Sequence, residues 1–434
     1  MIRFIYTVLL ILLSPFFLYS LYKKKEGKPT FGPRWKEHFG FTPPLNLPLG
    51  EKSIWIHTVS VGEVIGATPF IRVLKQQNPQ QIIVLTTTTA TGAQQAEKLK
   101  GLVEHRFMPL DFSGAVKRFI KAVQPQKMII METELWPNTL ATVHENDIEI
   151  IVMNARLSER SARRYAKFQS VFNLLSSSLD KVICQYKEDA ERFIRLGVLE
   201  EKVVISGSIK FDIHIENEIK TQAAYLRNQL QVTKGSKHDH QPLIWIAAST
   251  HQGEDEQVLE AHQQLLSSFP NAILILVPRH PERFNQVADL IEARNFYFSR
   301  RSTQSELVGN TQVYLADTMG EMLLLLAASH VCFMGGSLLG DKVGGHNLLE
   351  PAALGIPSIT GPSYYNFKEI TQQLLQAEAT TVCVNANQLA EQLISLFSNP
   401  GGRYDKGQQA LNVIKANTGA ISRTLSAINS VKAK

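Results

Sequence analysis

Short runs of valine, isoleucine and leucine recur along this chain and alternate with segments of helical periodicity. The first half contains SIWIHTVS, QIIVLTTTT, KMIIME, EIIVMNAR, KVICQ and VVISGS, and the second half contains PLIWIAAS, AILILVPR, QVYLAD, VCFMGGS, IPSIT and TVCV. Strands that are apolar on both faces are typical of parallel sheets covered by helices on both sides. We therefore predict an α/β protein, with helices in the first half near residues 64–77, 113–124, 158–178 and 187–196.

The pattern occurs twice, on either side of a polar stretch. The chain has 434 residues, more than one hydrophobic core usually organises. We predict a first Rossmann-like, doubly wound domain at residues 26–212 and a second such domain at 242–434 that includes the C-terminal helices. Between them we predict a linker at 213–241 that consists of a helix followed by a polar stretch. Two such domains that face each other would place the loops at the carboxyl ends of their strands on the walls of a central cleft.

The N-terminus predicts a membrane anchor over residues 1–25. Residues 4–22 carry no charge, and at about 1.5 Å per residue a helix of this length reaches roughly 28 Å, close to the thickness of a bilayer core. Lys23, Lys24 and Lys25 follow directly; they resist translocation and favour an uncleaved anchor with a cytoplasmic body over a cleavable signal peptide. Because Ser14 and Pro15 interrupt the run, a helix lying in the membrane interface is the alternative.

The charge distribution argues against a nucleic-acid partner. The formal net charge is +6, and most of the surplus lies within residues 1–40 beside the apolar segment. A nucleic-acid-binding protein is expected to spread basic residues over a folded face. Here the surplus indicates attraction to anionic lipid headgroups.

Acidic and basic residues follow several predicted strands of the first half. Glu63 comes after the first strand, in the opening turn of a helix, where it is either a catalytic carboxylate or a complement to the helix dipole. Glu132 and Glu134 follow the strand KMIIME, and two carboxylates there are costly unless a cation or a substrate meets them. We favour helix capping for Glu134 and function for Glu132. Lys210 follows the strand VVISGS, near the expected cleft.

The second half offers a candidate anion site. Arg279 closes a buried strand and could bind a phosphate at the start of the next helix, or pair with Glu282. The segment Asp317–Glu321 also follows a strand, and by itself it indicates a helix cap. His238, Asp239 and His240 lie in the polar linker, where a solvated stretch is favoured over a metal site.

A glycine-rich run is the most informative feature of the second half. Gly335 and Gly336 follow a strand, so that backbone N–H groups can turn toward an anion, and Asn347 is a candidate N-cap that would make Pro351 the fourth helical residue. The spacing of Asn347 and Glu350 is also that of a capping box. The alternative is a nucleotide site in which Glu350 accepts hydrogen bonds from ribose hydroxyls. Neither P-loop nor GxGxxG spacing is present, which argues against ATP hydrolysis and NAD chemistry.

These motifs together resemble the Kdo transferases of bacterial lipopolysaccharide synthesis. The matching runs are SVGE at 60–63, METELWPN at 131–138, NARLSERS at 154–161, GSIKFD at 207–212, VPRHPERF at 277–284, DTMGEM at 317–322 and GGHNLLE at 344–350. The resemblance implies a GT-B fold and an inner-membrane enzyme with its catalytic body on the cytoplasmic side. The implied reaction is inverting, metal-independent transfer of 3-deoxy-D-manno-octulosonic acid (Kdo) from CMP-Kdo to a tetra-acylated lipid A precursor, without a cofactor.

The resemblance also implies roles for individual residues. The general base of the family falls on Glu63, and its transition-state stabilising positions fall on Glu132 and Lys210. Its CMP contacts fall on Pro278, Arg279, Met319, Gly320, Glu321, Asn347, Leu348, Leu349 and Glu350. These roles are chemically reasonable, because a carboxylate can take a proton from a sugar hydroxyl while CMP leaves as a phosphate ester held by an arginine and helix N-termini.

Two other interpretations remain open at this stage. The chain could be a different GT-B enzyme, such as another lipid-directed glycosyltransferase or a sugar-nucleotide epimerase with a uridine donor. It could also be a membrane-anchored binding or assembly protein that retains the fold without turnover.

Overall fold

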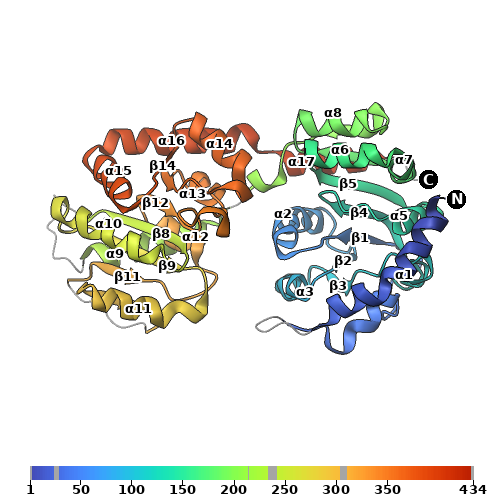
Figure 1. Ribbon diagram of the computed structural model, residues 1–434, viewed down its shortest axis with the longest axis horizontal. Helices are drawn as coiled ribbons and strands as arrows, with labels where there is room; N and C mark the ends of the chain where they lie inside the picture. Colours follow the sequence, from blue (N-terminus) through green and yellow to red (C-terminus); the bar gives the residue numbers. More distant parts are fainter. Residues whose placement is uncertain (1, 24–28, 214, 233–241, 304–309, 432–434) are drawn as a thin grey trace. The chain divides into compact units, whose positions relative to one another are not determined.

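The computed structural model describes residues 2–23, 29–213, 215–232, 242–303 and 310–431 of the chain (Figure 1). The chain divides into two compact units: unit 1 holds residues 1–212 and 417–434, and unit 2 holds residues 213–416. Each unit is built on its own seven-stranded sheet, in which all strand pairs are parallel. The prediction of two doubly wound α/β domains is confirmed.

The sheet of unit 1 has the strand order β3-β2-β1-β4-β5-β6-β7. Its strands are β1 Ser53–His57, β2 Ile83–Thr87, β3 Glu104–Phe107, β4 Pro125–Met131, β5 Glu149–Ala155, β6 Lys181–Cys184 and β7 Val203–Ile205. The helices are α1 Ile2–Tyr22, α2 Val61–Gln77, α3 Ala90–Ala96, α4 Ser113–Val123, α5 Pro137–His144, α6 Glu159–Lys167, α7 Gln169–Ser177, α8 Lys187–Arg195 and α17 Ala420–Asn429. The predicted helix 158–178 is two helices, α6 and α7.

The sheet of unit 2 has the order β10-β11-β9-β8-β12-β13-β14. Its strands are β8 Ile244–Thr250, β9 Ile273–Pro278, β10 Phe298–Arg300, β11 Val313–Leu315, β12 Val331–Met334, β13 Ser358–Thr360 and β14 Thr380–Val382. The helices are α9 Asn217–Val232, α10 Asp255–Ser268, α11 Phe284–Ala293, α12 Met322–Ala327, α13 Leu349–Ala353, α14 Lys368–Gln376, α15 Ala386–Ser398 and α16 Pro400–Asn417.

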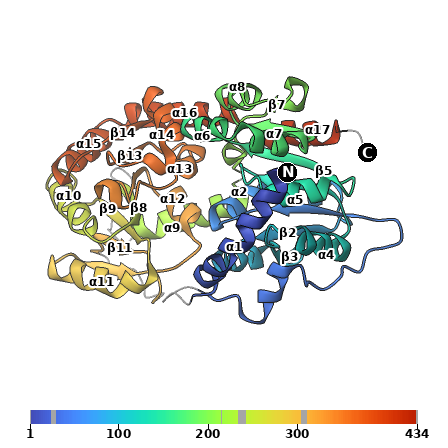
Figure 2. The ribbon, with the colours of Figure 1, turned by 45° about the vertical axis from the view of Figure 1, so that its right-hand side comes forward.

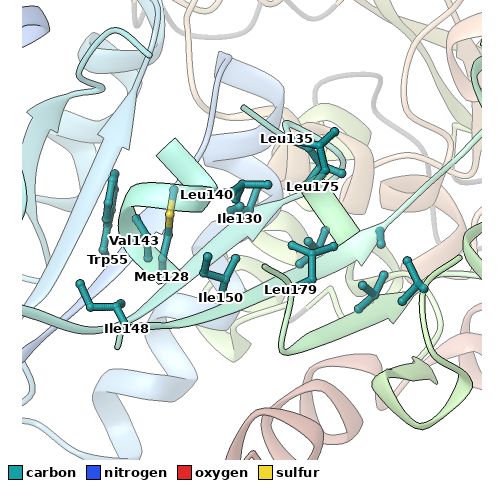
Figure 3. Close-up of a cluster of buried hydrophobic side chains, with 14 of the residues drawn as sticks. Trp55, Met128, Ile130, Leu135, Leu140, Val143, Ile148, Ile150, Leu175 and Leu179 are labelled. Atoms are coloured by element: carbon teal, nitrogen blue, oxygen red, sulfur yellow. The ribbon is translucent and has the colours of Figure 1, made fainter. Parts of the chain in front are cut away.

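Alternating residues of the unit 1 strands fill two separate cores. Trp55, Met128, Ile130 and Ile150 point into one core with residues of α4, α5 and α7 (Figure 3). Their neighbours along the strands, such as Ile54, Ile56 and Ile129, enter a second core with α2, α3 and α17. Burial on both faces explains why these strands are continuous apolar runs rather than alternating ones.

The C-terminal helix α17 belongs to unit 1, whereas the sequence placed residues 417–434 with the second domain. Asp212 holds this return, because its two carboxylate oxygens accept hydrogen bonds from the N–H groups of Gly419 and Ile421, each at 2.6 Å. Ile421, Leu425 and other apolar residues of α17 then complete the second core of unit 1. A tertiary contact of this kind leaves no signature in local periodicity.

The predicted linker at 213–241 contains the helix that the sequence indicates, but the structure assigns this helix to unit 2. Residues 217–232 form α9, which packs on α12 within unit 2. The guanidinium of Arg227 donates to the carbonyl oxygens of Ala327 and Ala328, at 2.6 and 3.0 Å, at the end of α12. Residues 233–241, with His238, Asp239 and His240, lie outside the described residues.

Helix α1 is the one described helix that is long and apolar enough to cross a membrane. It is consistent with a membrane anchor. It runs along the surface of unit 1, with its first residues near α5 (Figure 2). None of its residues is fully buried.

Candidate functional site

The residues predicted from sequence lie after the carboxyl ends of strands in both units. Unit 1 carries Glu63, Glu132 and Lys210, which follow β1, β4 and β7. Unit 2 carries the others: Pro278 is the last residue of β9, and the rest follow β9, β11 and β12. Parallel topology brings loops from distant parts of the chain to one edge of each sheet.

Glu63 lies half-buried in the first turn of α2. One of its carboxylate oxygens accepts a hydrogen bond from the N–H of Val59 at 2.8 Å, and the other accepts one from the Ser60 hydroxyl at 3.2 Å. Burial raises the pKa of Glu63 to about 7, with further increases from the charges of Glu132 and Glu134, despite the opposing hydrogen bonds. Near neutral pH the side chain is therefore balanced between its acidic and basic forms, as a general base requires.

Gly62 leaves open space beside Glu63. Outside the helix backbone and its sequence neighbours, the nearest described atom to a Cβ built on Gly62 would be the Ser60 Oγ, at 3.9 Å. Internal packing therefore does not require glycine at this position.

Glu132 and Lys210 form an ion pair. The Lys210 Nζ lies 3.0 Å from the Glu132 Oε1, and each side chain is about one-third exposed, at 37% and 32%. Glu132 has a φ of 61°, a left-handed conformation that costs about 1–3 kcal/mol for a residue other than glycine and is typical of functional sites. The cation that the sequence required beside Glu132 is Lys210.

Glu134 does not cap the next helix, contrary to the prediction. Its carboxylate accepts a hydrogen bond from the Trp136 indole at 3.3 Å. The N-terminus of α5 is capped from another loop by Asp111, which accepts from the N–H groups of Asn138 and Thr139 at 3.1 and 2.6 Å. Burial raises the pKa of Glu134.

The sequence analysis did not single out Asn154, which is the penultimate residue of β5, as a site residue. It is fully buried and also has a positive φ, of 51°. Its side-chain oxygen accepts a hydrogen bond from the N–H of Ile209 at 3.2 Å. Asn154 therefore fixes the turn that carries Lys210.

Arg279 is exposed after the end of β9, where Pro278 is buried. The guanidinium has no hydrogen-bond or ion-pair partner among the described residues. The predicted alternative, a pair with Glu282, is wrong: the Glu282 Oε1 lies 3.8 Å from the Nδ1 of His280 instead. The Arg279 side chain is thus available to a ligand.

Three histidines gather near Arg279, and we refer to His251, His280 and His346 as the histidine cluster. The Nε2 atoms of His251 and His346 lie 2.9 Å apart, with one donating to the other, and the rings stack within 9° of parallel. The His280 ring meets His251 edge to face. Burial lowers the pKa of His346 to about 4, and His251 and Arg279 add to this effect. The cluster was missed, although His251 directly follows β8.

The N–H groups after β12 already have an anion, because a carboxylate of the chain itself occupies the loop. Glu254 is fully buried and accepts hydrogen bonds from the N–H groups of Gly336, Ser337 and Leu338 at 2.7, 2.9 and 2.9 Å. It also accepts one from His251 at 3.0 Å. These N–H groups do bind an anionic group, as predicted, but the group is the Glu254 carboxylate and not a ligand.

The segment Asn347–Glu350 begins a helix later than predicted. Helix α13 has Leu348 as its N-cap residue and Pro351 as its third residue, while the Asn347 side chain accepts from the N–H of Leu349 at 3.1 Å. The capping-box alternative fails, because the Glu350 carboxylate has no partner among the described residues. Burial raises the pKa of Glu350. A half-buried carboxylate without a partner can accept ligand hydroxyl groups.

Two arginines at the end of β10 hold the segment 317–321: Arg300, the last residue of the strand, and Arg301, which follows it. The sequence did not predict these contacts. Arg301 binds Glu321 through two hydrogen bonds of 2.6 and 3.2 Å and lowers its pKa. The neighbouring Arg300 binds Asp317 at 2.7 Å. Glu321 makes no capping hydrogen bond to α12, contrary to the predicted cap. Met319 and Gly320 are exposed, so their backbone groups are accessible.

A metal site was not expected, and the described residues hold no group of three or more His, Cys, Asp or Glu side chains arranged for a metal ion. Metal independence stays a prediction.

Comparisons with known proteins give consistent results for both units. A family model described as 3-deoxy-D-manno-octulosonic-acid transferase (kdotransferase) matches residues 33–213, and one described as glycosyl transferases group 1 matches residues 226–413. The 3-deoxy-D-manno-octulosonic acid transferase of Haemophilus influenzae is 40% identical over 425 residues, covering 98% of this chain and 97% of that protein. The protein of the same name from Bordetella pertussis is 32% identical over 396 residues, covering 89% and 87%.

A solved structure supports the architecture. The crystal structure of UDP-GlcNAc 2-epimerase from Neisseria meningitidis bound to UDP-GlcNAc matches with a TM-score of 0.56, covering 87% of this chain and 100% of that chain. Its sequence is 13% identical. At this identity the likeness shows the fold alone, two parallel-sheet α/β domains of the GT-B type.

Proposed function

Because this chain belongs to the Kdo transferase family of glycosyltransferases, we propose that it transfers Kdo from CMP-Kdo to a tetra-acylated lipid A precursor in lipopolysaccharide synthesis. The observation that carries this proposal is Glu63, a carboxylate with a pKa of about 7 at the carboxyl edge of the sheet in unit 1. In this proposal unit 1 binds the acceptor and unit 2 binds the donor.

Glu63 is the general base of the proposed reaction. Its carboxylate takes the proton from an acceptor hydroxyl, whose oxygen forms the new bond to the anomeric carbon of Kdo. The bond between that carbon and the phosphate oxygen of CMP breaks, and CMP leaves with the bonding electrons. Attack from the face opposite to CMP inverts the anomeric configuration. The Val59 and Ser60 hydrogen bonds keep Glu63 in place for this step.

Glu132 and Lys210 stabilise charge in the transition state. The Lys210 ammonium, held at 3.0 Å from Glu132, offers a fixed positive charge to the developing negative charge of the reacting groups. Preorganised charges of this kind lower a barrier because they need no rearrangement during the reaction. The left-handed backbone at Glu132 and the Asn154 contact fix this geometry.

Unit 2 binds the nucleotide in this proposal. Arg279 and N–H groups of the histidine cluster bind the phosphate of CMP. The nucleotide also contacts the segment formed by Met319, Gly320 and Glu321. The ribose lies against residues 347–350, and its hydroxyl groups donate hydrogen bonds to the Glu350 carboxylate. Because Arg279 carries the positive charge for one phosphate, we propose that the reaction needs neither a metal ion nor a cofactor.

The proposed location is the cytoplasmic side of the bacterial inner membrane. The apolar helix α1 supports attachment there, and inner-membrane lipids are then partners together with CMP-Kdo and the acceptor. A nucleic-acid partner is not proposed.

The direct test is transfer by the purified full-length protein. The assay combines a labelled tetra-acylated lipid A precursor, CMP-Kdo and EDTA, and reads the product by thin-layer chromatography. We expect slower-migrating product in EDTA. Folded protein that binds CMP but forms no product would contradict the proposed acceptor.

Nucleotide selectivity separates the proposal from the alternatives. CMP should raise the melting temperature and UDP should not, whereas a uridine-dependent transferase or epimerase would give the reverse. A non-catalytic binding protein would respond to CMP without any transfer.

A further inference from the structure

One face of helix α1 packs on unit 1. Its half-buried residues include Arg3, Tyr6, Leu10, Ser14 and Leu18, which recur at intervals of three and four residues and so form one stripe of the helix. The opposite stripe is apolar and exposed, with relative exposures between 37% and 75%: Ile2, Phe4, Ile5, Val8, Leu9, Ile11, Leu12, Leu13 and Phe16.

Polar contacts hold both ends of α1 against the folded body. Near the start, the Arg3 guanidinium donates to Asn138 at 3.1 Å and to Thr142 at 3.0 Å, both on α5. At the end, the Tyr22 hydroxyl lies 2.7 Å from the Nδ1 of His38. If α1 crossed a bilayer in this position, the polar groups of α5 would enter hydrocarbon, which is costly. The geometry therefore favours a helix lying in the interface, with its exposed stripe toward the lipid.

Between α1 and the body lies a cavity of about 980 Å³, which we call the α1 pocket. This is near the upper end of the range of about 300–1,000 Å³ for ligand pockets. Its apolar lining includes Leu10, Leu18 and Leu21 from α1 and Phe112, Leu135 and Trp136 from the body. Ser14 of α1 and Ala90 of α3 also line it, from the two sides.

The α1 pocket adjoins the segment that positions Glu63. Thr88 and Thr89 line the pocket, and both donate to the carbonyl oxygen of Val59, the Thr88 N–H at 3.4 Å and the Thr89 hydroxyl at 3.2 Å. The N–H of the same Val59 donates to Glu63. The pocket therefore begins one residue away from the hydrogen bond that fixes the proposed base.

We propose that the α1 pocket binds an acyl chain of the lipid acceptor. The inference rests on the proposed function for the identity of the acceptor. The apolar lining of the pocket suits a hydrocarbon chain. Helix α1 forms one side of the pocket, and its exposed stripe faces the membrane. A lipid whose sugar headgroup reaches Glu63 can thus keep one acyl chain in protein instead of exposing it to water, where each CH₂ group costs about 0.8 kcal/mol.

The test is photolabelling of the full-length protein in phosphatidylethanolamine and phosphatidylglycerol vesicles. The probe is a tetra-acylated lipid A precursor with a diazirine on one acyl chain, used without CMP-Kdo, and labelled residues are identified by mass spectrometry. We expect labels on pocket residues such as Leu10 and Phe112. Labels confined to the exposed stripe, on residues such as Phe4 and Leu12, would overturn the proposal.

Two filling variants and one control sharpen the test. Ser14→Trp fills the pocket from α1, and Ala90→Phe fills it from the body without changing α1. Each should lower pocket labelling and raise the KM for the acylated acceptor about tenfold, with the CMP-induced shift in melting temperature unchanged. Leu13→Trp, on the exposed stripe, should change neither. Equal effects of all three variants, or no effect of the filling variants, would overturn the proposal.

Labelling requires no turnover, so the two proposals fail separately. Transfer with labels only outside the pocket overturns the α1 pocket and leaves the proposed function intact. Labels in the pocket without transfer support the pocket and count against the proposed reaction.

Discussion

The two units share a seven-stranded parallel sheet but differ in the residues that follow its strands. In unit 1 the loops present three carboxylates, and burial raises the pKa of Glu63 and Glu134. In unit 2 the loops present Arg279 and two histidines whose pKa values are lowered. The carboxylate of Glu254 accepts hydrogen bonds from backbone N–H groups and is not available to a ligand. The same architecture thus suits proton acceptance in one unit and anion binding in the other.

The largest effect is expected from Glu63→Gln. Removing the base should lower kcat about a thousandfold, since general bases contribute about 10²–10⁴ in rate. The CMP-induced rise in melting temperature should be unchanged, because unit 2 keeps its groups. The matched control is Glu134→Gln, a neighbouring carboxylate for which a change within about threefold is expected. Loss of CMP binding in Glu63→Gln would contradict the proposal that unit 1 supplies the base and unit 2 binds the nucleotide.

Arg279→Ala should weaken CMP binding about a hundredfold, which corresponds to about 2.7 kcal/mol. The reason is the loss of a charge-assisted contact to phosphate. Titration calorimetry with CMP measures the effect, and Arg294→Ala, another exposed arginine of unit 2, is the control. Unchanged affinity for CMP would remove Arg279 from the proposed nucleotide site.

Glu254→Gln should destabilise unit 2 by about 2 kcal/mol. The amide keeps one oxygen for the four N–H groups and loses the charge, and hydrogen bonds to charged groups contribute about 1.5–3 kcal/mol each. The free energy of unfolding is measured by urea denaturation, with hydrogen exchange in residues 244–260 and 331–338 as the readout for unit 2. The control is Glu256→Gln, at an exposed glutamate of the same unit. If both variants are equally stable, Glu254 does not hold the loop.

Gly62→Ala should give the smallest change. The fold has room for the methyl group, and alanine is favoured over glycine in helices, so the melting temperature should stay the same or rise. Activity should fall about tenfold if an acceptor occupies that space. Full activity in the alanine variant would show that the space beside Glu63 is not used.

The sequence predicted every strand of the two sheets except β3 and β10, which are one edge strand of each sheet. β2 and β5 are buried along their whole length, and apolar residues dominate their sequences, IVLTT and EIIVMNA. β3 and β10 lie at the sheet edges, and their sequences, EHRF and FSR, are short and mostly polar, so no apolar run marks them. The return of α17 to unit 1 depends on Asp212, a contact across more than 200 residues.

The candidate residues were easier to find than their partners. Every residue singled out follows a strand, except Pro278, which is the last residue of β9. The parallel topology then determines that such residues share an edge within each unit. The sequence could not show that Glu254 fills the glycine loop or that Asp111 caps α5, because both contacts join loops that are distant in the chain. His251 follows β8 directly, as Glu132 follows β4, and applying that rule to every strand end would have found it. Asn154 is the penultimate residue of β5 and gives no such signal.

The most direct test of the account is the pH dependence of kcat/KM for transfer. Below its pKa the Glu63 carboxyl is protonated and cannot accept the acceptor proton. We therefore expect kcat/KM to fall about tenfold per pH unit below about 7 and to level off above it. The same limb should be absent from the residual activity of Glu63→Gln. A profile that is flat from pH 5 to 8, or a limb that persists in Glu63→Gln, would contradict the assignment of Glu63 as the base.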